Sequence, residues 1–220
     1  MKKNKKNTIV VFTGVMFVIL FAIAATVYND KKNSDINNSF LEKSEHLQRD
    51  YSPRKGPRHA KVTIVEFFDP ACGTCSAFHP FVKQLMKDNR GKVNLVMRYL
   101  PLHSGSDVVV SILEAARLQN RFWQTLERAY KRRDAWIVNH TAKPEMFWRQ
   151  LGGLGLDLER LKIDMQSPDI AKRIQQDLAD AKELQVRKTP GFFVNGKPLI
   201  NFGDKQLKKL VESEVKENYP

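Results

Sequence analysis

The stretch that decides the fold is residues 62–75, VTIVEFFDPACGTC, in which an apolar run leads into two cysteines. Residues 62–68 are β-branched or aromatic apart from Glu66, which is typical of a buried strand. Cys72 and Cys75 are the only cysteines of the chain. Two thiols at this spacing can close into a small disulfide ring and reopen it. The sequence therefore predicts a reversible two-electron redox centre.

A purely structural disulfide is the alternative interpretation of this pair. A structural disulfide usually links distant segments, because closing a longer loop restrains the unfolded chain more. The loop between the two cysteines holds only Gly73 and Thr74. The spacing therefore favours redox chemistry over a structural bond.

A strand–helix–strand unit extends from the same stretch. Apolar residues recur at helical spacing from residue 71 to about residue 88, and Gly91 supplies a helix stop. Residues 93–100 are apolar again and end at Pro101, so they predict a second strand. Two strands joined by a helix imply a parallel pair with a right-handed crossover.

The rest of the chain separates into a helical block and a final β–α portion. From residue 104 to about residue 185 the sequence predicts helices and no strand. The expected helices are residues 108–118, 122–132, 144–151, 158–165 and 168–184, with Thr141 and Ser167 as candidate capping residues.

Strand character then returns at residues 191–194 and 197–200. Asn195-Gly196 lies between them and is the strongest short signal for a hairpin, because both residues tolerate positive φ. Residues 203–218 predict a closing amphipathic helix.

The N-terminal residues 1–28 predict a signal peptide or a membrane anchor. Four lysines precede an uncharged run from residue 7 to residue 29. A run of about 20 apolar residues is long enough to span a bilayer, whereas Ala22-Ile23-Ala24 offers a cleavage site. Both outcomes stay open: an anchor through residues 8–28 in the inner membrane, or secretion after cleavage. In either case we expect the body of the protein to be periplasmic or extracytoplasmic.

The composition bounds the remaining partners. Residues 29–56 are polar and predict a linker. The formal net charge is +13, and residues 117–133 form the densest basic stretch. A basic face attracts acidic surfaces or nucleic acid, but no nucleic-acid motif accompanies it. We therefore expect a solvated helix face and no nucleic-acid partner.

Three positions fit chemistry at the cysteines. Cys72 is expected at the start of the helix, where free N–H groups and the helix dipole lower the pKa of a thiol, while Cys75 lies one turn further in. Glu66 is a charged residue within the apolar strand. A buried carboxyl group has a raised pKa and can exchange a proton with a thiol, although a surface ion pair is the alternative.

Thr189-Pro190 opens the predicted hairpin. If its peptide bond is cis, Pro190 would block unwanted chemistry at the sulfurs. Thr189 would then leave its backbone free to pair with an extended substrate. A trans bond is the general default.

Glu66, the Cys72–Cys75 motif and Thr189-Pro190 occur in the order of a thioredoxin fold, and the helical block resembles that of the DsbA-like thiol–disulfide oxidoreductases. The resemblance covers about residues 57–218. It implies an α/β thioredoxin fold with an inserted α-helical domain, preceded by the signal-anchor segment. The expected domains are residues 57–103 with 186–220 for the thioredoxin fold, and residues 104–185 for the insertion.

The resemblance also implies roles for single residues. Cys72 would be the nucleophile, Cys75 the resolving cysteine, Glu66 the buried acid and Pro190 the cis-proline. Substrate contacts would come from Thr189, Gly73 and Thr74. Gly73-Thr74 replaces the Pro-His of the strongly oxidising members, and a threonine before the proline is similar to isomerases and reductases.

The expected function is thiol–disulfide exchange on protein substrates outside the cytoplasm. Oxidation is favoured, and reduction or isomerisation stays open. The partners would be proteins with thiols or disulfides and a membrane redox partner; no cofactor and no metal are expected. The alternative is a copper metallochaperone or redox sensor that uses Cys72, Cys75 and His79, which share a helix face. His103, in the loop after the second strand, is expected to be solvated.

Overall fold

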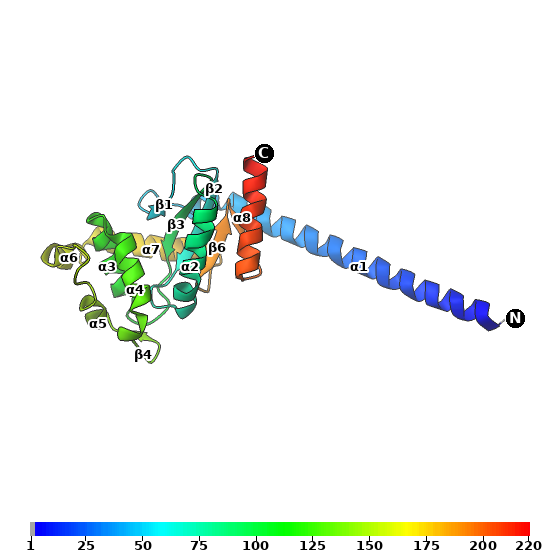
Figure 1. Cartoon of the computed structure of the whole chain (residues 1–220), viewed down its shortest axis with the longest axis horizontal. Coiled ribbons are helices and arrows are strands. Elements are labelled where there is room, and N and C mark those ends of the chain that lie inside the picture. Colours follow the sequence, from blue (N-terminus) through cyan, green and yellow to red (C-terminus); the bar gives the residue numbers. More distant parts are fainter. Residues whose placement is uncertain (1–2) are drawn as a thin grey trace. The chain divides into compact units, whose positions relative to one another are not determined.

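The computed structural model describes residues 3–220, and for residues 3–14, 33 and 36–42 it describes the backbone only. The chain divides into two compact units at Glu42. The first unit is the helix α1, Lys3–Glu42 (Figure 1). Among the described residues, no helix combines the length and the apolar character needed to cross a membrane. The predicted signal or anchor segment, residues 1–28, lies partly outside the described residues.

The second unit is built on a five-stranded sheet in the order β1-β3-β2-β6-β7 (Figure 1). Its strands are β1 (Arg54–Lys55), β2 (Val62–Phe68), β3 (Val93–Tyr99), β6 (Gly191–Val194) and β7 (Lys197–Pro198). β2 and β3 are parallel, and the other neighbours are antiparallel. The predicted strand–helix–strand unit is confirmed, because α2 (Gly73–Asp88) joins β2 to β3.

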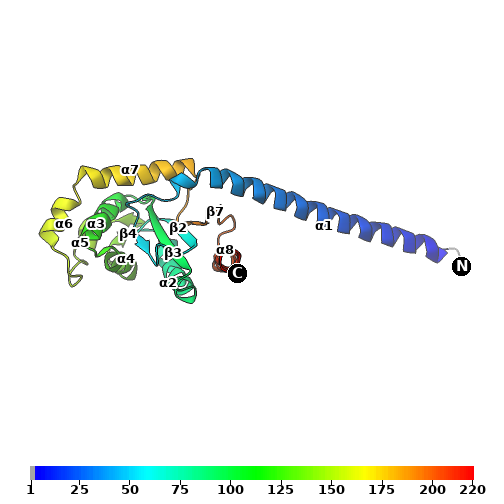
Figure 2. The ribbon, with the colours of Figure 1, turned by 90° about the horizontal axis from the view of Figure 1, so that it is seen from above.

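Helices cover both faces of this sheet, which explains why every residue of β3 is buried. Figure 2 shows α7 (Pro168–Glu183) on one side of the strands, and α2 with α8 (Asp204–Asn218) on the other. The hairpin between β6 and β7 turns at Asn195 (φ 47°) and Gly196 (φ 86°), as predicted. The predicted thioredoxin-like α/β fold is therefore confirmed in its sheet and its flanking helices.

The segment between β3 and β6 is mainly helical, as predicted. It contains α3 (Ser106–Leu118), α4 (Phe122–Lys131), a 3₁₀ turn η2 (Arg133–Ala135), α5 (Pro144–Trp148), α6 (Leu158–Asp164) and α7. The structure groups these helices with the sheet in one compact unit. The domain boundaries at residues 103 and 186 stay a prediction.

The expectation of no strand in this segment is wrong. A two-stranded hairpin forms from β4 (Ile137–Val138) and β5 (Thr141–Ala142). Its turn consists of Asn139 and His140, both with positive φ, and two such residues match the twist of a tight hairpin. Thr141 is consequently a strand residue and does not cap α5, whereas the Ser167 side chain accepts from Asp169 N–H at the start of α7.

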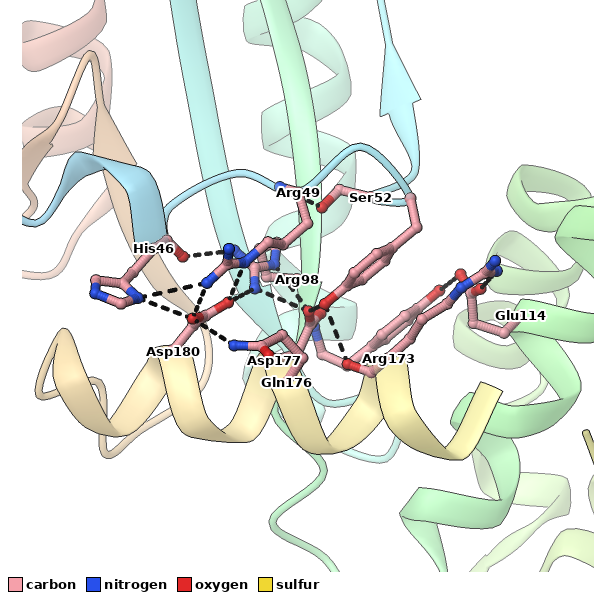
Figure 3. Close-up of polar contacts among 11 residues, drawn as sticks. His46, Arg49, Ser52, Arg98, Glu114, Arg173, Gln176, Asp177 and Asp180 are labelled. Carbon is pink, nitrogen blue, oxygen red and sulfur yellow. Dashed lines mark hydrogen bonds and ion pairs between the residues drawn. The ribbon is translucent and has the colours of Figure 1, made fainter. Parts of the chain in front are cut away.

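The predicted polar linker, residues 29–56, also differs from the structure. α1 continues to Glu42, and residues 43–56 belong to the second unit, with the 3₁₀ turn η1 (Ser44–His46) and strand β1. Leu47 is 2% exposed. Arg49 donates to Asp180 of α7 at 2.8 Å, and Arg98 donates to the His46 carbonyl at 2.6 Å (Figure 3). In residues 43–56, polar side chains such as His46 and Arg49 therefore pair with a buried acid of α7.

Candidate active site

The two cysteines lie at the start of α2 in different surroundings. Cys72 is the residue that precedes the helix, with extended backbone (φ −70°, ψ 122°), and Ser76 N–H donates to its carbonyl at 3.1 Å. Both cysteines are free thiols. Cys72 keeps 7% of its surface exposed and Cys75 none. One thiol can therefore be reached from solvent, while the other is shielded behind it.

The Cys72 thiolate is stabilised by its neighbours. Hydrogen bonding from the Cys75 thiol is the largest cause that lowers the pKa of Cys72, to about 5, and burial opposes it. The Thr189 side chain and the backbone N–H groups of Cys75 and Thr74 stabilise the thiolate further. These free N–H groups are those of the first helical turn. At neutral pH Cys72 is therefore in the ionised form that attacks disulfides.

Glu66 and Cys75 have the opposite character. Burial, then the bond to Cys72 and the charge of Glu66, raise the pKa of the Cys75 thiol far above its ordinary value. Glu66 is 1% exposed, and burial followed by the charge of Cys72 raises its pKa to about 8. Glu66 therefore holds a proton at neutral pH. A carboxyl group that titrates near neutrality beside a thiol of high pKa can give it a proton or take one from it.

Thr189 and Pro190 lie next to the cysteines although they are distant in the sequence. The Thr189–Pro190 bond is cis, as the resemblance implies. Cys72 Sγ lies 3.3 Å from the Thr189 carbonyl oxygen, to which it donates when it is protonated. β6 begins directly after Pro190 and pairs with β2, which brings the two segments together.

Gly73 and Thr74 are exposed beside the reachable sulfur. The Arg133 guanidinium lies next to them, because its Nε donates to the Ala71 carbonyl at 3.1 Å. A Cβ atom at position 73 would meet this guanidinium at 3.6 Å, which is ordinary contact. The surface around the motif therefore includes the Arg133 guanidinium, which comes from the segment between β3 and β6. The sequence did not indicate that this cation lies beside the cysteines.

Asp69 is a structural residue of the site that sequence reasoning missed. Its side chain is fully buried and accepts from Ala71 N–H at 2.8 Å, Leu102 N–H at 2.7 Å and His103 N–H at 2.9 Å, and also from the Ser106 hydroxyl. It thus ties the loop before the cysteines to the loop after β3. An aspartate that follows a strand and accepts from a backbone N–H two residues on is a known turn signal.

The expectation for His103 needs correction. Its Nδ1 lies 2.7 Å from Asp69 Oδ2, and the side chain is 27% exposed. It is held by a buried carboxylate and is not simply solvated.

Comparison with known proteins decides the family. Residues 48–213 match the family described as Thioredoxin. The chain belongs to the thioredoxin family.

Thioredoxin-family relatives and structures refine this assignment. The chain is 27% identical over 227 residues to the "Probable disulfide bond formation protein D" of Bacillus cereus, a match that covers 98% of this chain and 100% of the relative. It is 30% identical over 189 residues to the "Na(+)/H(+) antiporter NhaA" of Herminiimonas arsenicoxydans. That match covers 86% of this chain and only 29% of the antiporter.

Among solved structures, a thioredoxin-like oxidoreductase from Silicibacter pomeroyi DSS-3 superposes with a TM-score of 0.68 at 28% identity. The match covers 81% of this chain and 97% of the other. Within the thioredoxin family, the predicted membership of the DsbA-like thiol–disulfide oxidoreductases is confirmed.

His79, the third residue of the alternative metal site, lies one helical turn beyond Cys75 on α2 and packs against Tyr130. His79 is 6% exposed, and its ring centroid is 5.1 Å from that of Tyr130. Burial, and then the charge of Lys83, lower the pKa of His79 to about 4. No group of three histidine, cysteine or acidic side chains that could hold a metal ion gathers within the described part of the chain.

Proposed function

We propose that the protein introduces disulfides into protein substrates outside the cytoplasm, through Cys72 and Cys75. The observation that carries the proposal is the contrast between the two thiols. The pKa of Cys72 is lowered to about 5, while that of Cys75 is raised. A stabilised Cys72 thiolate favours the reduced enzyme, so the disulfide form is a stronger oxidant. Stabilisation by Cys75, Thr189 and the backbone replaces the missing histidine of the motif.

The exchange proceeds in two attacks. A substrate thiolate attacks Cys72 Sγ of the oxidised enzyme, the Cys72–Cys75 bond breaks, and Cys75 leaves with the electron pair. Cys75 takes a proton from Glu66, whose pKa of about 8 lies below that of the buried thiol. A second substrate thiolate then attacks the substrate sulfur of the mixed disulfide. Cys72 leaves as a thiolate, so two electrons have passed from substrate to enzyme.

Substrate binding would involve the residues next to Cys72. The Thr189 carbonyl, 3.3 Å from Cys72 Sγ, and the exposed Gly73 and Thr74 offer polar backbone to an extended peptide that carries the reacting sulfur. Pro190 has no N–H group, so it cannot donate a hydrogen bond to the cysteine sulfurs in competition with the substrate. A peptide bound in this way would place its cysteine in line with Cys72.

Export and reoxidation complete the proposal. Residues 1–28 combine N-terminal lysines with an uncharged run, and disulfides persist outside the cytoplasm. We assign reoxidation of the Cys72–Cys75 dithiol to a membrane redox partner that donates a disulfide. Fractionation of cells that express the full chain tests export. Carbonate extraction and the mass of the recovered protein then distinguish a retained anchor from a cleaved signal.

The deciding experiment uses single-cysteine variants and a redox titration. Cys72→Ser should abolish oxidation of a dithiol peptide, whereas Cys75→Ser should attack a peptide disulfide through Cys72 and accumulate the resulting mixed disulfide, because the resolving thiol is missing. Equilibration with glutathione should give a potential closer to about −120 mV than to about −270 mV. A value near the lower figure would reassign the enzyme to disulfide reduction, and full activity of Cys72→Ser would overturn the proposal.

A further inference from the structure

The Arg133 side chain is held in a fixed position beside the motif. Its Nε donates to the carbonyl of Ala71, a residue with no exposed surface, at 3.1 Å. Its own carbonyl accepts from Trp136 N–H at 3.1 Å, and Trp136 is fully buried. The side chain is therefore anchored both at its backbone and at Nε. A guanidinium held in this way presents its two terminal NH₂ groups as a planar fork.

The terminal NH₂ groups of Arg133 have no strong partner. Within the described part of the chain, the one ion-pair partner of Arg133 is Asp134, whose carboxylate lies 3.9 Å from Arg133 Nη1 and is fully exposed. An ion pair this long and this exposed contributes little, because water and salt screen it. The Arg133 side chain itself is 24% exposed. The fork is therefore available to an anion that arrives from solvent.

The fork lies beside the residue that follows the reachable cysteine. A Cβ atom at position 73 would be 3.6 Å from both the central carbon and Nη2 of the Arg133 guanidinium. Gly73 is exposed and directly follows Cys72. Successive residues of an extended chain are about 3.3 Å apart. A substrate that brings its sulfur to Cys72 therefore brings the residues beside that sulfur within reach of Arg133.

Five basic residues lie in the two segments that frame the Cys72 sulfur, and we call them the cationic rim: Lys131, Arg132, Arg133, Arg187 and Lys188. The first three belong to the segment around η2. The last two are exposed and directly precede Thr189, whose carbonyl oxygen lies 3.3 Å from Cys72 Sγ. Apart from Arg133, no side chain of the rim forms an ion pair with another described residue.

The acids near the cysteines do not neutralise the cationic rim. Glu66 is 1% exposed and keeps its proton at neutral pH, because burial and then the charge of Cys72 raise its pKa to about 8. Asp69 is fully buried, and backbone N–H groups of the two adjoining loops donate to it. The surface around the reachable sulfur is therefore positive, and such a field attracts acidic groups.

We propose that Arg133 is a specificity-determining residue, whose guanidinium binds the carboxylate of an aspartate or glutamate beside the reacting cysteine of a protein substrate. The proposal rests on the proposed function. A carboxylate matches the fork in shape as well as in charge, because two parallel hydrogen bonds can join the two planar groups. The other cations of the rim steer acidic substrates toward the site. The Cys72 thiolate has its own hydrogen-bond donors, so the guanidinium stays available to the substrate.

Three dithiol peptides that differ only beside one cysteine test the proposal. The two residues that flank this cysteine are glutamate, glutamine or lysine. Stopped flow measures the second-order rate constant with which the oxidised full-length protein oxidises each peptide. Each constant is divided by that of the same peptide with glutathione disulfide, which removes differences in the intrinsic reactivity of the thiol. We expect a preference of about tenfold for the glutamate over the lysine peptide at low salt, and a smaller one at about 1 M salt.

Variants at position 133 show whether this cation is responsible. Arg133→Gln should lose most of the preference by slowing the glutamate peptide, while the glutamine peptide stays within about twofold of its wild-type rate. Arg133→Glu should reverse the preference in favour of the lysine peptide. The matched control is Arg160→Gln, because Arg160 pairs with Asp164 within α6 and should leave all three rates unchanged.

Equal normalised rates for the three peptides in the wild-type protein would overturn the proposal, as would an unchanged preference in Arg133→Gln. If Arg133→Gln lost its fold together with the bond to Ala71, Arg133→Lys would decide. Lysine keeps the charge but cannot form two parallel hydrogen bonds, so the preference should fall to an intermediate value, and an undiminished one would count against the fork. If the wild-type protein oxidised none of the peptides, the proposed function would fail instead.

Discussion

Buried charge is handled in opposite ways on the two faces of β2 and β3. At Arg98, whose side chain is fully buried, the guanidinium donates to Asp177 at 2.8 Å and to Asp180 at 2.5 Å (Figure 3). At Glu66, one carboxyl oxygen has no partner among the described residues. The first arrangement fixes charges in place, whereas the second leaves an acid ready to exchange its proton.

The pKa shifts follow from this difference. Burial works against ionisation at Asp180, but hydrogen bonds from Arg49, His46 and Arg98 hold its pKa well below its usual value. Burial meets no such opposition at Glu66 and raises its pKa to about 8. Pairing therefore separates a structural acid from a chemically active one in the same fold.

The largest effect is expected where the pairing is complete. Arg98→Met leaves Asp177 and Asp180 without their shared cation, and breaking a buried ion pair costs about 3–5 kcal/mol. Urea unfolding, followed by circular dichroism, measures this loss. Arg160→Met is the control, because Arg160 pairs with Asp164 on an exposed helix face and should change the stability by only about 0.5 kcal/mol. Equal losses in the two variants would contradict the comparison.

A smaller and pH-dependent effect is expected at Glu66. The folded protein keeps the Glu66 proton up to about pH 8, whereas the unfolded chain releases it near the ordinary value of 4.5. Its contribution is therefore complete below the ordinary pKa and is lost as the pH rises to 8, by about 1.4 kcal/mol per pH unit at most. Glu66→Gln should flatten this alkaline decline in the free energy of unfolding.

Asp180 should give the opposite sign. Because its pKa is lowered on folding, its contribution is present above the ordinary value of 3.8 and is lost as the pH falls. Asp180→Asn should therefore weaken the protein near neutral pH and flatten only the acid side of the profile. If Glu66→Gln changed the acid side of the stability profile, or Asp180→Asn its alkaline side, pairing would not control the titration of these two acids.

The face of the sheet that carries Glu66 and the cysteines could be predicted from the sequence, because its signals are local. Residues 62–68 form β2 as predicted, and Asn195-Gly196 makes the expected turn. Cys72 and Glu66 were found because a motif and an acid within an apolar strand are visible in a short window. Their placement also follows from the fold that the resemblance implied.

The opposite face, where Arg98 pairs with Asp177 and Asp180, could not be predicted, because its partners are far apart in the sequence. Arg98 and Asp177 meet only after α7 packs on β3, and Arg49 of the segment 43–56 likewise reaches Asp180, 131 residues away in the sequence. Tyr130 was missed for the same reason: its sequence pattern is that of an ordinary aromatic residue on a helix. Only the packing of α4 on α2 brings it against Ser76 and His79 of the helix that carries the cysteines.

The smallest predicted effect compares two tyrosine hydroxyls. Tyr51 donates to Asp177 at 2.6 Å, whereas the Tyr130 hydroxyl has no partner among the described residues. Tyr51→Phe should cost about 1–2 kcal/mol in urea unfolding, because it removes a hydrogen bond to a buried carboxylate. Tyr130→Phe should cost nothing or stabilise the protein slightly, because it removes a hydroxyl that has no hydrogen-bond partner among the described residues. Equal losses of stability in the two variants would show that the hydrogen bond to Asp177 does not distinguish the two hydroxyls.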